Sequence, residues 1–149
     1  MKIRKATLKD SEIYARLREE NVREYSKIIG KKINSPRNKA KKELTGIIKD
    51  KKRGLIFAKE KEEVIGYVLY SIFINEWNKF LYIDDIFVKK EHRREGIGEM
   101  LIDKLIEIMR QKNIKKCRLG VSIKNNKAFS FYKKLGFKTM HYEMDLDIK

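Results

Sequence analysis

The chain has 149 residues, of which 42% are hydrophobic, so it is long enough for one domain with its own core. Lysine and arginine outnumber aspartate and glutamate by 37 to 21, and the net charge of +16 would attract an anionic partner such as nucleic acid, a membrane surface or a phosphate-bearing small molecule. The single cysteine excludes an internal disulfide, and two histidines are too few for a typical zinc site.

The first third of the chain predicts a short strand and two helices. Lys2 to Ala6 has the pattern of a strand, and Asp10 can cap a helix that runs to about Ile28. Ser35 and Pro36 suit the N-cap and first turn of a second helix, which would reach about Asp50. Most of the excess positive charge lies in this part of the chain.

A hairpin and a further strand are predicted next. Gly54 to Lys59 and Val64 to Ile74 are rich in β-branched and aromatic residues, and the charged stretch between them is typical of a turn. Phe80 to Val88 predicts another strand, nearly all apolar except for the adjacent carboxylates Asp84 and Asp85. Two carboxylates inside such a strand are candidates for a functional role.

The last third predicts two helices and two strands. An amphipathic helix from Ile97 to about Lys112 precedes a short strand, Lys116 to Val121. A second helix runs from Asn125 or Asn126 to Leu135, and Phe137 to Leu146 is predicted as the final strand.

The order of these elements predicts an α/β fold with a mixed sheet. Strand 80–88, helix 97–112 and strand 116–121 form a strand-helix-strand unit, so the two strands should be parallel neighbours with a right-handed crossover. The remaining strands are more naturally antiparallel. We therefore expect one parallel pair in a mostly antiparallel sheet.

The segment from Val88 to Gly98 has the features of an anion-binding site. It leads from a buried strand into the first turn of a helix, where unpaired backbone N–H groups and the helix dipole attract negative charge. Gly96 and Gly98 would let a diphosphate approach the backbone, and Arg93 and Arg94 add positive charge. A tight turn into a packed helix would also explain the two glycines. The spacing fits neither a P-loop nor the three-glycine dinucleotide fingerprint.

Two motifs in this half of the chain resemble those of the GNAT superfamily of N-acetyltransferases. The strand 83–88 followed by Arg93-x-x-Gly96-x-Gly98 is similar to the coenzyme-binding motif of the family. A second match, to the last helix of the family, is Asn125-x-x-Ala128-x-x-Phe131-Tyr132-x-x-x-Gly136-Phe137. The resemblance covers about Leu81 to Phe137, with departures at Arg94 and Lys90, where the family usually has glycine and proline.

The resemblance implies an acetyl-CoA-dependent N-acetyltransferase, an acyltransferase of the EC 2.3.1 type, formed by one domain over residues 1–149. Its fold would be the GNAT type of α/β fold, with a mostly antiparallel central sheet, one parallel splayed strand pair and helices on both faces. The coenzyme pyrophosphate would bind to the amides from Arg94 to Glu99, and the pantetheine arm would pair with the main chain of Ile86 to Val88. The implied coenzyme-binding residues are Ile86, Phe87, Val88, Arg93, Arg94, Glu95, Gly96, Ile97, Gly98, Glu99 and Asn125.

The resemblance also implies catalytic roles for Tyr132 and Asp84. Attack of a neutral amine on the thioester requires one group that accepts a proton and another that protonates the departing thiolate. Tyr132 is placed as the general acid, although it could also be an ordinary packing residue. Asp84 would act as the base, directly or through water, or would only bind the cationic amine. A bulge common in this strand of the family would lie near Asp84 and Asp85 and splay the strands, whereas in an unbulged strand the two carboxylates face opposite sides and only one can face the substrate.

The acceptor is less well specified by the sequence. In the family the first two helices, the hairpin and the region equivalent to Trp77 usually line the acceptor pocket. The candidate pocket residues are therefore Tyr25, Phe73, Trp77 and Tyr142. Each of them could also be a packing residue. The basic stretch from Lys31 to Lys42 argues against a polycation as acceptor and for an acidic or nucleic-acid-associated partner, or is simply a solvated helix face.

The expected partners are acetyl-CoA and an amine acceptor, which is a small molecule, a protein N-terminus or a lysine, while a homodimer is left open. A basic nucleic-acid-binding module is an alternative supported by net charge alone, because RNP-type aromatics, zinc ligands and helix-turn-helix spacing are absent. A sensor that binds acetyl-CoA without catalysis is another. Because no long apolar run or signal-type stretch is present, we expect a cytoplasmic protein without a membrane partner, and we expect no metal.

Overall fold

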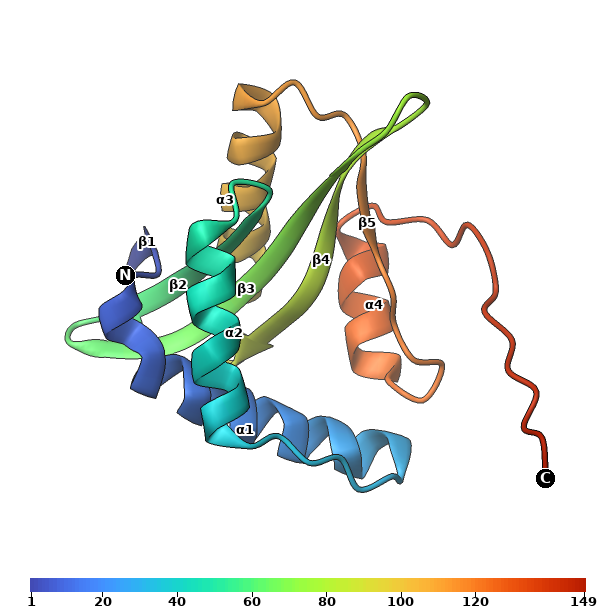
Figure 1. The fold of residues 1–149 in the computed structure, drawn as a ribbon, viewed down its shortest axis with the longest axis horizontal. Helices are drawn as coiled ribbons and strands as arrows, with labels where there is room; N and C mark the ends of the chain where they lie inside the picture. Colours follow the sequence, from blue (N-terminus) through green and yellow to red (C-terminus); the bar gives the residue numbers. More distant parts are fainter.

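The computed structural model describes residues 1–149, which form a five-stranded sheet flanked by four α-helices (Figure 1). In chain order the elements are β1 (Lys2–Lys5), α1 (Ser11–Ile29), α2 (Arg37–Lys49), β2 (Arg53–Glu60), β3 (Glu63–Ile74), β4 (Lys79–Val88), α3 (Ile97–Gln111), β5 (Cys117–Leu119) and α4 (Asn126–Lys134). Short 3-10 turns at Leu8–Asp10 and Lys90–His92 precede α1 and follow β4. Each of these helices and strands was predicted from the sequence to within two residues at either end.

The strands lie in the order β1-β2-β3-β4-β5, and every neighbouring pair is antiparallel except β4 with β5. The unit β4-α3-β5 requires that parallel pair, because α3 returns the chain to the end of the sheet at which β4 began. The mixed, mostly antiparallel sheet predicted from the sequence is therefore confirmed.

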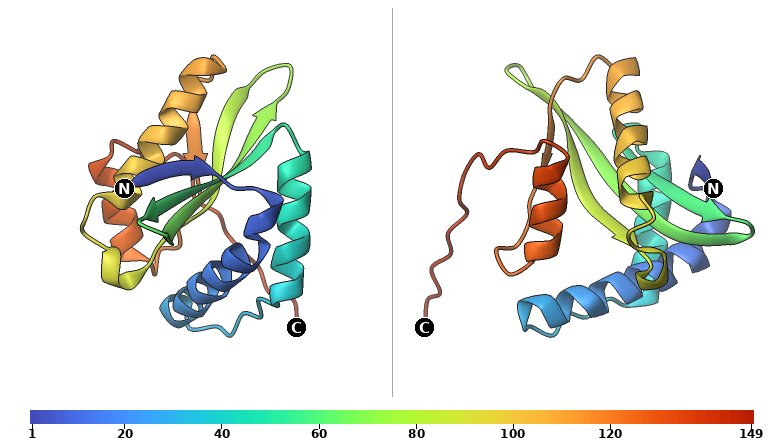
Figure 2. Two further views of the ribbon diagram at one scale, coloured as in Figure 1. Left: turned by 90° about the vertical axis from the view of Figure 1, so that its left-hand side faces the viewer. Right: turned by 180° about the vertical axis from the view of Figure 1, so that it is seen from behind.

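Helices cover both faces of the sheet (Figure 2). On one face, Leu101 and Leu105 of α3 belong to an apolar core with Leu81 of β4. On the opposite face, Tyr14 of α1 packs in a second core with Phe57 of β2. The burial of one side of each helix against the sheet stabilises the layers, and the outer sides are polar. None of the helices combines the length and the apolar composition that a membrane span needs.

The turn from β1 into α1 is held by a half-buried ion pair. Asp10 is 5% exposed and accepts hydrogen bonds from the Arg4 guanidinium at 2.7 and 2.9 Å and from the Thr7 backbone N–H at 2.7 Å. The bonds from Arg4 are the main cause that lowers the pKa of Asp10 to about 2. Asp10 precedes α1 as predicted, but its side chain binds the turn before the helix instead of the N–H groups of α1.

The predicted strand from Phe137 to Leu146 does not form, so this prediction was wrong for the single chain. Residues 138–149 have no regular secondary structure, and they extend away from the rest of the domain (Figure 1). An alternating pattern describes the two faces of a strand, but a strand also needs a neighbour for its backbone N–H and C=O groups. Within this chain the segment has no such neighbour.

Candidate active site

Strands β4 and β5 separate after a short stretch of pairing. Residues 81–83 of β4 pair with residues 117–119 of β5, whereas β4 stays paired with β3 as far as Val88. From Asp84 to Val88, the edge of β4 that faces β5 therefore has no strand partner. The splayed pair expected from the family resemblance is present, and it offers a free strand edge to an extended ligand.

A β-bulge lies where the two strands separate. Leu69 of β3 is opposite Asp85, but the next residue, Tyr70, is opposite Ile83, so Asp84 is an extra residue on β4. The side chains of both carboxylates consequently lie on the face of the sheet that α1 and α2 cover. The expected position of the bulge is confirmed, and the alternation that would have placed the two carboxylates on opposite faces does not apply.

Asp85 is bound by three side chains. Arg18 Nη1 lies 2.5 Å from Asp85 Oδ2, Asn21 Nδ2 lies 2.8 Å from Oδ1, and the Tyr67 hydroxyl donates to Oδ2 at 2.5 Å. The Asp85 side chain is 17% exposed. These bonds tie α1 to β4 and use most of the acceptor positions of the carboxylate, so few remain for a substrate.

No sequence motif singles out the three residues that bind Asp85. Arg18 and Asn21 lie on α1 next to the buried residues Leu17 and Val22. Polar residues on the buried side of an amphipathic helix need a polar partner in the core, and that pattern was the available signal. Tyr67 gave no signal, because an aromatic residue in a buried strand is ordinary.

Asp84 accepts fewer hydrogen bonds than Asp85. Its only hydrogen bond comes from the Ser71 hydroxyl at 2.6 Å, and the residue is exposed. Neighbouring groups nevertheless crowd its carboxyl, and this loss of hydration is the main reason why the pKa of Asp84 is raised above its ordinary value. The hydrogen bond from Ser71 and the charge of Arg53 act in the opposite direction and lower the pKa. Asp84 therefore has the free lone pairs and the direction of pKa shift that suit a proton acceptor.

The side chain of Arg93 holds the loop between β4 and α3 in place through contacts within the protein. Its Nε donates to the Val88 carbonyl at 2.9 Å, its Nη2 binds Glu24 of α1, and its guanidinium lies over the ring of Phe87. Because these contacts use the guanidinium, the side chain of Arg93 orients the loop. Arg94 is exposed and adds its positive charge just before α3.

The backbone N–H groups of residues 94–99 make no hydrogen bond within the protein. They lie at the N-terminus of α3, whose first bond runs from the Met100 N–H to the Gly96 carbonyl. Arg94 and Gly96 both have left-handed backbone, with φ of 71° and 79°. Left-handed residues turn successive N–H groups toward one side, and the positive end of the helix dipole adds to their attraction for an anion.

The two glycines of the motif are favoured for different reasons. A Cβ placed on Gly98 would lie 3.0 Å from Cζ of Phe131, so the ring of Phe131 on α4 fills the space that a side chain would need. A Cβ on Gly96 would meet nothing within 4 Å, and there the φ of 79° favours glycine because any other residue would be strained. Gly98 therefore allows α4 to pack against the start of α3, a reason that the sequence did not reveal.

Helix α4 begins close to the end of α1. Asn125 caps α4, because its Oδ1 accepts a hydrogen bond from the Ala128 N–H at 3.2 Å. Lys124 Nζ, just before this cap, donates to the Ile29 carbonyl at the end of α1 at 3.1 Å. The side-chain oxygen of Asn125 is thus used by the helix, and its amide nitrogen is free.

Tyr132 lies on α4 with its ring buried. The residue is 8% exposed, and its ring packs against those of Phe131 and Phe137 with centroids 5.3 and 5.6 Å apart. Its hydroxyl has no partner within the protein, yet it is not sealed from solvent as the Tyr14 hydroxyl is. Burial, followed by the negative charge of Asp85, raises the pKa of Tyr132 well above its ordinary value. The hydroxyl therefore keeps its proton at neutral pH.

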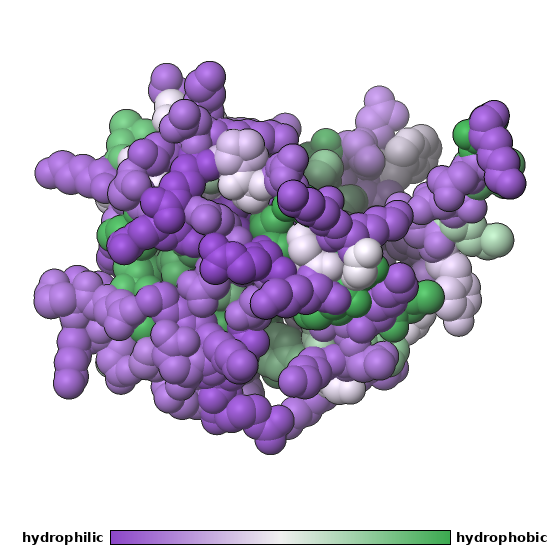
Figure 3. Space-filling model, turned by 90° about the horizontal axis from the view of Figure 1, so that it is seen from below, coloured by the Kyte–Doolittle hydropathy of each residue, from purple (hydrophilic) through white to green (hydrophobic).

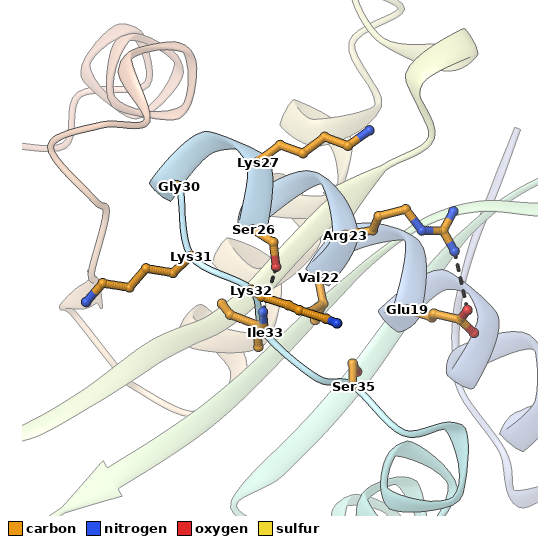
Figure 4. Close-up of a pocket in the computed structure, with 10 residues that line it drawn as sticks. All are labelled: Glu19, Val22, Arg23, Ser26, Lys27, Gly30, Lys31, Lys32, Ile33 and Ser35. Atoms are coloured by element: carbon orange, nitrogen blue, oxygen red, sulfur yellow. Dashed lines mark hydrogen bonds and ion pairs between the residues drawn. The ribbon is translucent and has the colours of Figure 1, made fainter.

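A hollow of about 470 Å³ lies beside the second half of α1 and the loop to α2 (Figure 4). Its lining residues are Glu19, Val22, Arg23, Ser26, Lys27, Gly30, Lys31, Lys32, Ile33 and Ser35. Four of these are basic and one is acidic, so the hollow suits an anionic group better than a cation. Seen from below, this side of the molecule is mainly hydrophilic, with hydrophobic side chains visible between the polar ones (Figure 3).

The aromatic residues predicted for the acceptor pocket do not line this hollow. Phe73 stacks on Phe80 with centroids 5.2 Å apart, near the end of the β3–β4 hairpin. Trp77 is 86% exposed in the turn of that hairpin, and Tyr142 is 85% exposed in the C-terminal segment. Tyr25 lies on α1 and is partly exposed. Their roles toward an acceptor stay predictions.

Comparison with known sequences agrees with the family resemblance of the two motifs. A model of the Acetyltransferase (GNAT) family matches residues 14–137. Thialysine N-epsilon-acetyltransferase of Sus scrofa is 37% identical over 78 residues, which are 52% of this chain and 46% of that protein. An N-alpha-acetyltransferase of Sulfurisphaera tokodaii is 30% identical over 114 residues, with 66% of each chain covered. The chain thus spans about half the length of the first of these relatives.

Comparison with solved structures supports the same fold. A tetramutant of the protein BH1408 from Bacillus halodurans superposes with a TM-score of 0.88 and 24% identity, covering 99% of this chain and all of that one. At this identity the likeness shows the fold and no more.

The left-handed backbone at Arg94 leads to a prediction about stability. A residue other than glycine in this region is strained, so Arg94→Gly should raise the free energy of unfolding by roughly 0.5–1 kcal/mol. Urea denaturation monitored by circular dichroism measures the difference. Arg94→Ala is the matched control, because it removes the same charge and keeps the strain. Equal stabilities of the glycine and alanine variants would contradict the strain.

Proposed function

The chain belongs to the GNAT acetyltransferase family, and from this premise we propose that it is an acetyl-CoA-dependent N-acetyltransferase. It would transfer an acetyl group from the coenzyme thioester to a primary amine by direct attack. The names of two relatives, an N-epsilon- and an N-alpha-acetyltransferase, support an amine nitrogen as the acceptor.

The observation that carries this proposal is the row of unpaired N–H groups at residues 94–99 beside the open edge of β4. The pyrophosphate would accept hydrogen bonds from this row, with Arg94 adding charge and Arg93 holding the loop in place. The pantetheine arm would pair with the main chain of Ile86 to Val88, which has no strand on that side. The free amide nitrogen of Asn125 would donate to this arm or to a water beside it.

Tyr132 and Asp84 would move the two protons of the reaction. As the amine nitrogen bonds to the carbonyl carbon, the carbon–sulfur bond breaks, and the Tyr132 hydroxyl protonates the departing sulfur. Asp84 accepts the proton that the attacking nitrogen loses, directly or through water. A bulge leaves its extra residue without a ladder partner, and the backbone N–H there would polarise the thioester carbonyl.

The basic hollow beside α1 favours an acceptor that carries a negative group as well as its amine. Arg23, Lys27, Lys31 and Lys32 would attract a phosphate or carboxylate and repel a polyamine. A panel that contains spermidine, an amino sugar phosphate, lysine and peptides with acidic N-termini distinguishes these classes by the release of free CoA. Binding of acetyl-CoA without turnover of any amine would instead identify a non-catalytic sensor.

The anion site predicts a strong dependence of affinity on the pyrophosphate. Acetyl-CoA should bind at least about 100-fold more tightly than acetyl-pantetheine, because charge-assisted hydrogen bonds contribute about 1.5–3 kcal/mol each. Isothermal titration calorimetry with the full chain measures both dissociation constants. Acetyl-pantetheine is the matched control, since it keeps the thioester and the arm. Similar affinities for the two ligands, or no binding of acetyl-CoA, would refute the proposed function.

The role of Tyr132 predicts a loss of turnover without a loss of coenzyme binding. Tyr132→Phe should lower kcat by roughly 100-fold, the usual contribution of a general acid, and should leave the affinity for acetyl-CoA almost unchanged. Tyr70→Phe is the control, because Tyr70 is also buried with a raised pKa but lies in the core under α3. A matching loss of affinity in Tyr132→Phe would remove Tyr132 from the chemistry.

The role of Asp84 predicts a change in the pH profile. A base must be unprotonated, so activity should fall as the pH drops through the Asp84 pKa, which lies above the ordinary aspartate value of about 3.9. Asp84→Asn should remove this limb and lower kcat by about 100-fold. Asp85→Asn should keep the limb and instead lower the free energy of unfolding by about 1–3 kcal/mol, since it weakens the bonds to α1. An unchanged pH profile in Asp84→Asn would show that Asp84 is not the base.

A further inference from the structure

Three side chains that can bind a metal ion converge between the β2–β3 turn and the loop that precedes α3. The Nδ1 atom of His92 lies 3.4 Å from a carboxylate oxygen of Glu95 and 3.8 Å from one of Glu60. The three potential ligand atoms all lie within 4.8 Å of one another. Ligand atoms that share an ion at about 2.0–2.2 Å lie roughly 3–4 Å apart, so small side-chain rotations would bring all three onto one ion.

The donor atoms suit a divalent transition-metal ion such as Zn²⁺. Imidazole nitrogen and carboxylate oxygen are both ordinary zinc ligands, and three protein ligands with water in the open position are a common zinc arrangement. Mg²⁺ and Ca²⁺ prefer oxygen ligands, so one imidazole with two carboxylates selects against them. The expectation of no metal rested on the number of histidines, and it did not consider one histidine with glutamates from a separate hairpin.

The two carboxylates of this cluster have no lysine or arginine partner. The next acidic residues of the same turn each pair with a lysine, as Glu62 does with Lys59. Glu60 and Glu95 have only the imidazole of His92 within ion-pair distance. Two carboxylates that face one imidazole remain uncompensated whenever the ring is neutral, and a divalent ion would compensate both of them.

The backbone around the cluster is held in place by hydrogen bonds. The N–H of His92, in the 3-10 turn, donates to the Lys89 carbonyl at 3.0 Å. The Lys89 N–H in turn donates to the Ile65 carbonyl of β3 at 2.9 Å. The loop is therefore tied to the hairpin that carries Glu60, and ligands on a fixed backbone need little rearrangement to bind an ion.

A hollow of about 820 Å³ opens beside the cluster. Glu60 and His92 form part of its wall, together with residues from the first half of α1. Four of its lining residues are acidic and three are basic, in a protein whose net charge is +16. The hollow is thus a locally acidic place on a basic protein, with room for the water that would complete the coordination of an ion.

We propose that Glu60, His92 and Glu95 bind a divalent transition-metal ion of the Zn²⁺ type, which joins the β2–β3 turn to the loop before α3. Glu95 is also one of residues 94–99, whose backbone N–H groups make no hydrogen bond within the protein. The ion would neutralise two carboxylates at this row of N–H groups and so strengthen its attraction for a pyrophosphate. This link to the coenzyme rests on the proposed function, whereas the metal site itself does not.

Isothermal titration calorimetry of Zn²⁺ with the untagged full chain tests the metal site. One ion should bind per molecule, and Mg²⁺ should give no comparable heat. Glu60→Gln and His92→Asn should each raise the dissociation constant for Zn²⁺ at least about tenfold, because each removes one ligand. Both residues have exposed side-chain surface, so folding, followed by circular dichroism, should be unaffected.

Two variants serve as matched controls. Glu62→Gln changes a glutamate of the same turn that pairs with Lys59, and His141→Asn changes the other histidine of the chain. Both should bind Zn²⁺ as the unchanged chain does. Absence of Zn²⁺ binding, or binding that the cluster variants and the controls affect equally, would mean an adventitious ion only and would overturn the proposal. Co²⁺ provides a further check, since a thiolate charge-transfer band in its absorption spectrum would place the ion at Cys117 instead.

A second titration tests the link to the coenzyme. Zn²⁺ at a concentration that saturates the unchanged chain should tighten the binding of acetyl-CoA about fivefold, a typical coupling between two sites. The same Zn²⁺ should have no such effect on Glu60→Gln, which alters no residue of the proposed coenzyme site and also corrects for Zn²⁺ bound by the coenzyme itself. An unchanged affinity with Zn²⁺ bound would overturn the link. Failure of acetyl-CoA to bind at any Zn²⁺ concentration would instead refute the proposed function, and the metal site would stand or fall by its own titration.

Discussion

The parallel pairing of β4 with β5 over only three residues is the constraint on which the candidate site depends. It holds the two strands together at residues 81–83 of β4 and lets them diverge beyond Ile83. The divergence exposes the edge of β4 as far as Val88, and the chain then turns directly into the loop that precedes α3. A strand edge and a helix N-terminus with unpaired N–H groups therefore lie in sequence along one path, which matches a long ligand with an amide-containing arm and a diphosphate.

The bulge at Asp84 gives two adjacent carboxylates different surroundings. Asp85 accepts hydrogen bonds from Arg18, Asn21 and Tyr67, and it joins α1 to the sheet. Asp84 has a single hydrogen bond and remains exposed. A regular strand would have sent one of the two to the face under α3. The extra residue instead keeps both on one face, so one can hold the helix while the other stays available.

The sequence predicted the helices and strands well where the pattern and the packing agree. The apolar stripe from Ile97 to Gln111 predicts α3 because the same stripe is what the sheet buries. The bulge could be placed only through the family resemblance, because register is decided by the partner strand β3. Two of the three partners of Asp85, Arg18 and Asn21, come from an element 64 or more residues away in the chain, which no local pattern connects. The prediction of a last strand was wrong because an alternation of apolar and polar residues does not supply the neighbouring strand that pairing needs.

The contact between Gly98 and Phe131 has a consequence for how such chains evolve. Substitution of Gly98 would place a Cβ 3.0 Å from the ring of Phe131, and substitution of Gly96 would strain the backbone. Neither effect involves a bound molecule. Purifying selection on folding alone would therefore retain both glycines in a descendant that had lost its coenzyme. In such lineages the glycine pair would outlast the activity, whereas the open edge of β4 and the Tyr132 hydroxyl would be free to drift.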